Sequence, residues 1–348
     1  MHSGRKNAIG LGVIGLGYWG PNHIRVVQES ERTNLNWICD SNQTRLTQMS
    51  SKTRAATTTQ VEKVFNDPAT DAVIISTPIS THYELGMSAL EAGKHVLIEK
   101  PIAGSQAEAD DLINAAEQNG LVIMCGHTFL FSPPVVAIKE IIRRGELGDI
   151  YFISSSRVNL GLHQSDASVL WDLAPHDFSI ILNWIDEVPV SVSSVGRDSI
   201  GSGVFDVAFT NLVYESGLIA NVELSWLAPS KLRRTTVVGS KKMIVYDDTA
   251  PEQVRVFDRG VNLDNPETFG AHQLTYRAGD IVSPHLASSE PMSVQLNSFV
   301  DAVVSGNYPA EYIRIARDVV GLIEAAERSL TNLGVRTEYR AMQTAQAS

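Results

Sequence analysis

Short apolar runs alternate with longer amphipathic segments over the first 125 residues of the chain. The runs predict strands at residues 9–14, 35–39, 72–76, 95–98 and 121–124, and the segments at residues 81–91 and 106–118 have the apolar spacing of helices. Strands that are apolar on both faces suit a parallel sheet covered by helices on each side. The pattern therefore predicts an N-terminal α/β domain with a doubly wound parallel sheet.

The pattern changes near residue 150, where segments of alternating apolar and polar residues follow one another with few helices between them. We expect strands at residues 150–158, 190–196, 204–214, 217–227, 234–239 and 243–246, with turns at residues 215–217 and 239–242. Helices are predicted at residues 172–184 and 315–330. The second domain is thus expected to be α+β, on a large open and mostly antiparallel sheet. We place the domains at residues 1–128 and 129–348, with the last helix able to pack back on the first domain.

Composition narrows the class of protein. The chain has 348 residues, 43% of them apolar and 19% charged, which is ordinary for a globular protein with a full core. Its net charge of −11 supplies no basic field for a phosphate backbone, so we expect no nucleic-acid partner. No apolar stretch approaches the roughly 20 residues of a membrane helix, so we expect no membrane partner. Cys39 and Cys125 lie in apolar runs without metal-ligand spacing and are interpreted as core residues of a cytoplasmic protein.

A glycine-rich turn follows the first predicted strand. In Gly15-x-Gly17-x-x-Gly20 the first glycine permits a tight turn, the second lets the backbone approach a pyrophosphate, and the third lets a helix lie close to the strand. Asp40 closes the second strand at the distance expected for a carboxylate that binds the adenosine ribose, and its charge repels a 2′-phosphate. The spacing predicts a dinucleotide site that favours NAD, although the nearby Arg45 leaves NADP open.

Two later strand ends carry candidate chemistry. Thr77-Pro78 and Glu99-Lys100 follow predicted strands, and ligands of open parallel sheets lie at the carboxyl ends of the strands. Lys100 is expected to hydrogen-bond and polarise a substrate hydroxyl or carbonyl. The alternative is a solvated lysine that merely ends a strand.

Asp172 and His176 are four residues apart in a predicted helix, and such a pair shares one helical face. We interpret His176 as the base for a hydroxyl proton and Asp172 as its support. The alternative is that Pro175 lies in the first helical turn and that Asp172 is only the N-cap. Asp177 is expected either to interact with the helix dipole or to accompany His176.

These motifs together resemble the Gfo/Idh/MocA family of nicotinamide oxidoreductases, in order and over nearly the whole chain. The motifs are the glycine turn, Thr77-Pro78 with Thr81-His82, Glu99-Lys100-Pro101, Gly126-His127 and Asp172-x-x-x-His176. The resemblance implies a Rossmann domain, a sheet domain used for oligomerisation, and a catalytic set of Lys100, Asp172 and His176. It implies that the dinucleotide is lined by Gly15, Gly17, Tyr18, Trp19, Gly20, Asp40, Thr77, Pro78, His82, Glu99 and Lys100.

Within the family, the segments around Arg157 and Asp172 resemble a branch that oxidises or reduces a ring carbon, often C3, of UDP- or TDP-hexoses in polysaccharide pathways. Substrate contacts are then expected from Lys100, Arg157, Asn159, His163 and His176. For Arg157 and Asn159 the alternative is a solvated pair on the sheet face. Residues 309–314 depart from the acidic-glycine segment common in that branch, which leaves binding of the nucleotide half open.

Two other functions stay open. One is a dehydrogenase of a free sugar or polyol with the same catalytic set, and the other is a dinucleotide sensor without turnover. The histidines show no paired ligand spacing, so no metal site is expected. An open sheet with one apolar face indicates a homodimer or a homotetramer. The basic residues at 229–234 are expected to lie at a solvated sheet edge, with a phosphate-facing or subunit-contact patch as the alternative.

Overall fold

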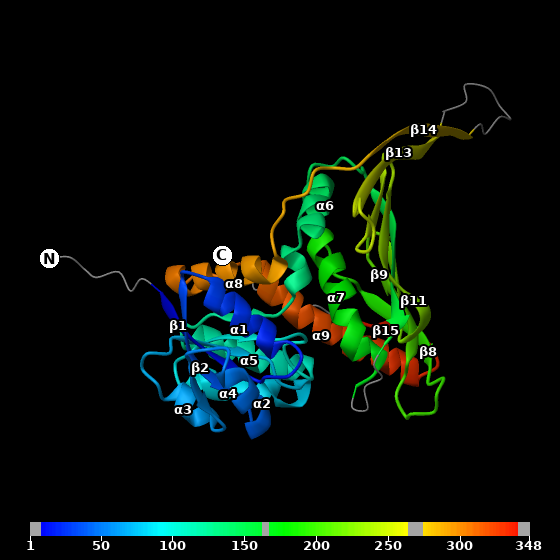
Figure 1. Ribbon diagram of the computed structural model, residues 1–348. Coiled ribbons are helices and arrows are strands. Elements are labelled where there is room, and N and C mark those ends of the chain that lie inside the picture. The colour runs from blue at the N-terminus through cyan, green and yellow to red at the C-terminus, as the bar shows by residue number, and fades with distance from the viewer. Residues whose placement is uncertain (1–7, 162–166, 264–273, 340–348) are drawn as a thin grey trace. The chain divides into compact units, whose positions relative to one another are not determined.

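The computed structural model describes residues 8–161, 167–263 and 274–339 (Figure 1). The described chain forms two compact units. Unit 1 comprises residues 8–131 and 289–321, and unit 2 comprises the described residues of 132–288 and 322–339. The division differs from a single boundary after residue 128, because helix α8 (Pro291–Ser305) packs on α1 (Gly20–Glu29) and on the short helix η2 (Thr128–Phe131) within unit 1.

Unit 1 contains the predicted doubly wound sheet. Its six strands are all parallel and lie in the order β3-β2-β1-β4-β5-β6. The strands are β1 (Ile9–Ile14), β2 (Thr33–Cys39), β3 (Ala56–Thr58), β4 (Ala72–Ile75), β5 (His95–Ile98) and β6 (Ile123–Cys125). The predicted N-terminal fold is confirmed.

The helices of unit 1 surround this sheet, and all of them except η1 (Ile79–Thr81) bury apolar residues. They are α1, α2 (Gln43–Ser50), α3 (Val61–Phe65), η1, α4 (His82–Glu91), α5 (Gln106–Gln118), η2 and α8, together with the first part of α9 (Ala310–Thr331). Leu11 and Val13 of β1 are fully buried, and they share one core cluster with Phe299 of α8. Burial of an aliphatic or phenyl side chain contributes about 1.5–3 kcal/mol, so α8 stabilises the same core although it is distant in sequence. In the described ranges, no helix has the length and apolar character needed to cross a membrane.

Unit 2 is built on a nine-stranded sheet of order β14-β13-β12-β11-β7-β10-β9-β8-β15. Its pairs are antiparallel except for β7 and β10, which confirms the expected mostly antiparallel sheet. The strands are β7 (Ile150–Leu160), β8 (Ser191–Arg197), β9 (Val207–Val213), β10 (Ile219–Ser225), β11 (Leu227–Gly239), β12 (Met243–Asp247), β13 (Val254–Leu263), β14 (Leu274–Val282) and β15 (Thr337–Glu338). The helices of this unit are α6 (Pro133–Arg143), α7 (Val169–Trp184) and the last part of α9.

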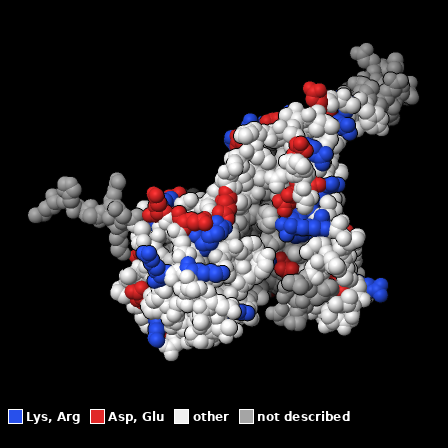
Figure 2. All heavy atoms as spheres, in the orientation of Figure 1, with Lys and Arg blue, Asp and Glu red and all other residues white. Residues whose placement is uncertain are grey.

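The basic cluster at residues 229–234 is not in an edge strand of the sheet, so that part of the prediction is wrong, but residues 229–231 and Arg234 are solvated as expected. The cluster is part of β11, which has β7 on one side and β12 on the other. Arg233 pairs with Asp248 and Arg234 with Asp247, so carboxylates at the end of β12 and directly after it balance both guanidinium groups. The face drawn in Figure 2 likewise shows acidic and basic side chains interspersed, with no continuous field of either sign.

Helix α7 lies along one face of the large sheet (Figure 1) and packs on β7, β9 and β10. It begins at Val169 after Ser168, three residues earlier than predicted. Asp172 therefore lies inside the helix, its N–H already donates to the Ser168 carbonyl, and the N-cap interpretation of Asp172 is wrong. Pro175 lies in the interior of the helix and has no backbone N–H. The Trp171 carbonyl therefore receives no hydrogen bond from the residue four positions later.

Candidate functional site

The carboxyl ends of five parallel strands lie in one row in unit 1. The cross-strand neighbours that form the row are Ile14, Cys39, Ile75, Ile98 and Cys125. The residues that follow them are Gly15, Asp40, Ser76, Glu99 and Gly126. The register of the sheet therefore brings the glycine turn, Asp40 and the Glu99-Lys100 turn to one edge, as predicted.

The glycine turn has the shape that a pyrophosphate requires. Gly15 has a φ of +93°, and a Cβ on it would collide with the Ser76 carbonyl. A Cβ on Gly20 would collide with the Gly15 carbonyl, so both residues are needed for packing. A Cβ on Gly17 would meet nothing within 4 Å, so the space beside this backbone is open. Helix α1 has no acidic residue in its first turn, which suits an anion at its N-terminus.

Asp40 supports the turn and faces the expected ribose position. Its Oδ2 accepts the Leu16 N–H at 2.7 Å, and its Oδ1 accepts the Asn42 N–H at 2.7 Å. The Arg45 guanidinium, which is about half exposed, lies 3.7 Å from Oδ2. A carboxylate has capacity for further hydrogen bonds, so Asp40 can hold the turn and still accept a ribose hydroxyl.

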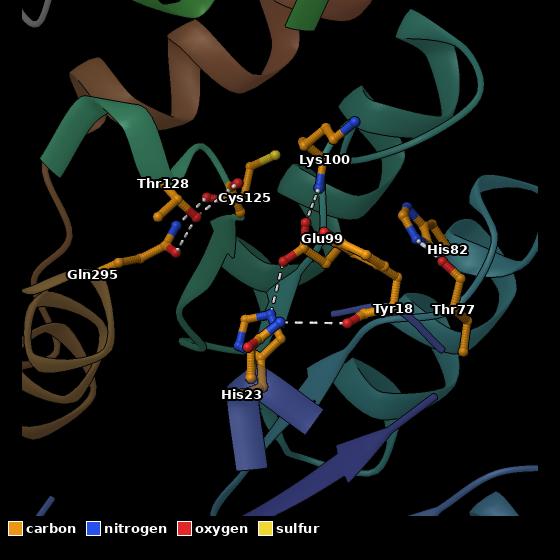
Figure 3. Close-up of polar contacts among 11 residues, drawn as sticks. Tyr18, His23, Thr77, His82, Glu99, Lys100, Cys125, Thr128 and Gln295 are labelled. Atoms are coloured by element: carbon orange, nitrogen blue, oxygen red, sulfur yellow. Dashed lines mark hydrogen bonds and ion pairs between the residues drawn. The ribbon is translucent and has the colours of Figure 1, made fainter. Parts of the chain in front are cut away.

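A buried contact joins α1 to the end of β5 (Figure 3). The His23 Nε2 lies 2.7 Å from the Glu99 Oε1, and the Glu99 Oε2 accepts the Lys100 N–H at 3.2 Å. Burial alone would raise the pKa of Glu99, but the hydrogen bond from His23 and the positive charges of His23 and Lys100 hold it below its ordinary value. The Lys100 side chain extends away from this pair in Figure 3. The ionised Glu99 therefore orients the backbone from which Lys100 projects.

His82 joins two turns rather than presenting its ring at the surface. Its Nδ1 lies 2.8 Å from the Pro101 carbonyl oxygen, its Nε2 lies 2.9 Å from the Thr77 carbonyl oxygen, and the residue is 1% exposed. Burial lowers the pKa of His82, and the two backbone hydrogen bonds oppose that shift only in part. Thr77 and Pro78 lie in the first of these turns and Lys100 precedes the second, so His82 fixes two strand ends relative to each other.

Two aromatic residues of the glycine turn are exposed. Tyr18 is 84% exposed and Trp19 is 41% exposed, and their rings meet edge to face with centroids 5.3 Å apart. Such exposed rings offer apolar surface next to the open backbone at Gly17, where the family resemblance places the dinucleotide.

The Gly126-His127 turn packs against Glu99. A Cβ on Gly126 would lie 3.0 Å from the Glu99 Cα, and Gln295 of α8 holds the turn by donating to the Cys125 carbonyl at 3.3 Å. Gln295 also accepts the Thr128 hydroxyl at 2.9 Å. Burial lowers the pKa of His127 to about 4, so this side chain is neutral at pH 7.

In unit 2 the two other predicted catalytic residues lie on α7. Asp172 and His176 are one helical turn apart and share a face of that helix. The indole Nε1 of Trp226 donates to the Asp172 Oδ2 at 3.0 Å. Trp226 was missed from the sequence, since nothing in its local pattern indicates a partner 54 residues away.

Arg157 is engaged in a buried ion pair. Its Nε lies 2.5 Å from the Asp177 Oδ2, and the two side chains are 6% and 3% exposed. Ser155 donates to the Asp177 Oδ1 at 2.8 Å. Neither role expected for Asp177 is found, because its partner is Arg157, and the solvated alternative for Arg157 is wrong because the side chain is buried. Asn159 is partly exposed near the end of β7, and His163 lies outside the described residues.

The cysteines are core residues. Cys39 and Cys125 are both buried and free, and burial raises the pKa of the Cys39 thiol to about 12. Across residues 8–161, 167–263 and 274–339, no group of three or more His, Cys, Asp or Glu side chains is arranged to hold a metal ion.

Comparison with protein families matches both halves of the chain. A model described as "Oxidoreductase family, NAD-binding Rossmann fold" covers residues 9–127. A second, described as "GFO/IDH/MocA C-terminal domain", covers residues 135–245.

Individual relatives act on different substrates. The UDP-N-acetylglucosamine 3-dehydrogenase of Acidithiobacillus ferrooxidans is 29% identical over 68% of this chain and 73% of its own length. The myo-inositol 2-dehydrogenase of Thermotoga maritima is 27% identical over 71% of this chain and 78% of its own length. The solved structure of GenD2 from gentamicin A biosynthesis, in complex with NAD, superposes with a TM-score of 0.82 at 23% identity. That match covers 98% of this chain and 99% of the other, and it shows a shared fold.

Proposed function

Because the chain belongs to the Gfo/Idh/MocA family of oxidoreductases and carries its NAD-binding Rossmann domain, we propose that it is a dehydrogenase or ketoreductase of a sugar ring carbon. The first candidate substrate is a nucleotide-linked hexose, with C3 as the reacting carbon. A bound nicotinamide ring accepts or supplies the hydride, and the protein provides binding, orientation and proton transfer.

The observation that carries the proposal is the placement of Lys100. It follows β5 at the edge where the glycine turn, Asp40 and Glu99 also lie, and Glu99 is held by His23 at 2.7 Å. An ammonium group at this edge can donate to a substrate oxygen and polarise it. The same lysine on a solvated loop would have no buried carboxylate to orient its backbone.

On α7, His176 takes the hydroxyl proton during oxidation and returns it during reduction, and Asp172 supports it. The pair has the spacing for this role, and Asp172 is held by the Trp226 indole. The assignment of these two residues and Lys100 to one reaction rests on the family resemblance.

We propose that NAD is preferred to NADP. The Asp40 carboxylate stands at the end of β2, where a 2′-phosphate would meet its negative charge. Arg45 offsets that charge in part, because its guanidinium lies 3.7 Å away and about half exposed.

The nucleotide-linked substrate is supported by the similarity to UDP-N-acetylglucosamine 3-dehydrogenase and by the predicted roles of Arg157, Asn159 and His163. A second candidate is a free polyol or sugar. Burial of Arg157 in an ion pair with Asp177 favours it, because a guanidinium already paired at 2.5 Å is poorly placed to bind a pyrophosphate. The similarity to myo-inositol 2-dehydrogenase favours it as well. A third candidate function, a dinucleotide sensor without turnover, requires neither Lys100 nor the Asp172 and His176 pair on α7.

We propose that the protein forms a homodimer or a homotetramer through the large sheet. Phe152, Phe209 and Ile219 of neighbouring strands are each between 43% and 46% exposed, so apolar side chains gather on one sheet face. Light scattering after gel filtration should give the mass of two or four chains, and a monomer at micromolar concentration would contradict the assembly.

The test of function is nicotinamide absorbance after mixing the protein with NAD or NADP and a panel of UDP- and TDP-hexoses, myo-inositol and glucose. Turnover restricted to nucleotide-linked sugars supports the first candidate, and turnover restricted to free polyols or sugars supports the second. Tight NAD binding without turnover, in either direction and with the matching keto-sugars included, would favour the sensor.

A further inference from the structure

Trp226 lies where the chain crosses the end of a strand. Strand β7 lies between β10 and β11 in the sheet, and Trp226 is the single residue between the end of β10 at Ser225 and the start of β11 at Leu227. Its carbonyl accepts the Gly161 N–H at 2.9 Å just beyond β7, and its own N–H donates to the Asp206 carbonyl at 3.0 Å. Both sides of its backbone are therefore fixed by neighbouring strands.

The indole ring is packed as firmly as the backbone. Trp226 is 1% exposed, and a Cβ added to Gly161 would lie 3.0 Å from its Cδ1 and 3.4 Å from its Cγ. A glycine at the end of β7 thus makes room for the ring. The ring in turn directs its N–H to the Asp172 Oδ2 at 3.0 Å.

We infer that Trp226 is a positioning residue that acts through Asp172. Its hydrogen bond fixes the carboxylate of Asp172 on the face of α7 that also carries His176. This inference rests on the proposed function, since it matters for turnover only if Asp172 supports the proton transfer.

Trp184 provides a matched control in the same unit. It is 4% exposed, and its indole Nε1 donates to the Val135 carbonyl at 3.0 Å. Replacing either tryptophan by phenylalanine removes one buried indole N–H and leaves an aromatic ring in place. The two variants therefore lose similar packing and one hydrogen bond each, but only Trp226→Phe changes a contact to Asp172.

Steady-state kinetics distinguish the two variants. The assay contains NAD and either UDP-N-acetylglucosamine or myo-inositol, whichever the native protein oxidises. We expect Trp226→Phe to lower kcat about tenfold, the scale of one charge-assisted hydrogen bond, with the KM for NAD unchanged. Trp184→Phe should keep kcat within about twofold. Equal kcat values in the two variants would overturn the inference.

A second measurement does not depend on turnover. In ¹⁵N-indole spectra, Asp172→Asn should shift the Trp226 N–H resonance strongly and leave that of Trp184 in place, and an unshifted Trp226 resonance would overturn the contact. Asp172→Asn also distinguishes the proposed role of Asp172 from the positioning role of Trp226. Full activity of this variant would refute the proposed role of Asp172 itself. Loss of its activity, with Trp226→Phe matching Trp184→Phe, would refute the positioning role alone.

Discussion

The edge of the six-stranded sheet and the face of α7 hold their reactive groups in different ways. At the sheet edge, Asp40 and Lys100 come directly after or within two residues of strands whose last residues lie in one row. Buried polar contacts such as that between His23 and Glu99 then brace the turns. On α7, the direction of Asp172 depends on helix rotation and on the side chain of Trp226, which lies between β10 and β11. Backbone register places the first set of groups, and long-range side-chain contacts place the second.

The difference has a physical consequence. A group set by register keeps its position when its own side chain is changed, because the strand ends remain bonded to their neighbours. A group set by side-chain contacts depends on each partner, because a buried charge without its partner is costly. Substitutions at the sheet edge should therefore change chemistry with little loss of stability, whereas substitutions beneath α7 should change stability first.

The largest expected effect is at the sheet edge. Lys100→Ala removes the donor to the substrate oxygen and should lower kcat by roughly a thousandfold, within the range of a lost acid–base group. NAD affinity should stay near that of the native protein, because the glycine turn and Asp40 do not depend on this side chain. Turnover assays and a fluorescence titration of NADH check both statements, and unchanged turnover would sink the assignment of Lys100.

Beneath α7, Asp177→Asn should mainly cost stability. Arg157 would remain buried without its carboxylate, which costs about 3 kcal/mol of unfolding free energy. Urea unfolding measures the loss, and Glu140→Gln in the exposed pair with Arg143 is the control that should change much less. A stability loss no larger than that of the control, with a raised KM for a UDP-hexose, would instead support a substrate contact for Arg157.

A smaller effect is expected in the pH dependence of the unfolding free energy. Burial lowers the pKa of His127 from its ordinary 6.5 to about 4, so the unfolded chain takes up the proton first as pH falls. The stability that the neutral His127 contributes is complete above pH 6.5 and is lost between about pH 6.5 and 4. At pH 5 the loss is about 2 kcal/mol relative to pH 7. His127→Phe should flatten this part of the unfolding profile, and removal of the exposed His285 should not; a profile unchanged by His127→Phe would contradict the shift.

The smallest effect concerns the choice of dinucleotide. Asp40→Asn retains an oxygen that can accept the Leu16 N–H but removes the negative charge that faces a 2′-phosphate. The ratio of NADP to NAD affinity should rise about tenfold, which corresponds to about 1.4 kcal/mol. Fluorescence titrations with both reduced dinucleotides measure the ratio. If the native protein already binds NADPH more tightly, Arg45 rather than Asp40 decides the preference.

The sequence predicts the fold and the candidate site best where a local apolar pattern by itself determines the position of a strand. Runs that are apolar on both faces predict buried parallel strands, and the structure places the residues after such runs, Asp40 and Lys100 among them, at one edge of the sheet. The predicted start of α7 at residue 172 is three residues late, because prolines favour the first helical turn, whereas Pro175 lies in the interior of α7. Strands β13 and β14 were missed because charged residues such as Arg255 and Arg277 interrupt their apolar pattern.

Contacts between distant side chains could not be predicted. The pairing of Arg157 with Asp177 and of Trp226 with Asp172 depends on how α7 packs on the sheet, and no spacing along the chain encodes that packing. Burial of His82 is a similar case. Its place in the motif indicates proximity to the dinucleotide, but only the fold shows that both ring nitrogens face backbone carbonyls.

The proposed reaction is the oxidation of a sugar ring carbon by NAD, with Lys100 polarising the substrate oxygen. The most direct measurement follows nicotinamide absorbance for the native protein and Lys100→Ala, with NAD and either UDP-N-acetylglucosamine or myo-inositol. We expect turnover of one of these substrates by the native protein, and a loss of roughly a thousandfold in the variant with NAD still bound. Turnover that survives the substitution, or native protein that binds NAD but converts neither substrate nor its keto form, would contradict it.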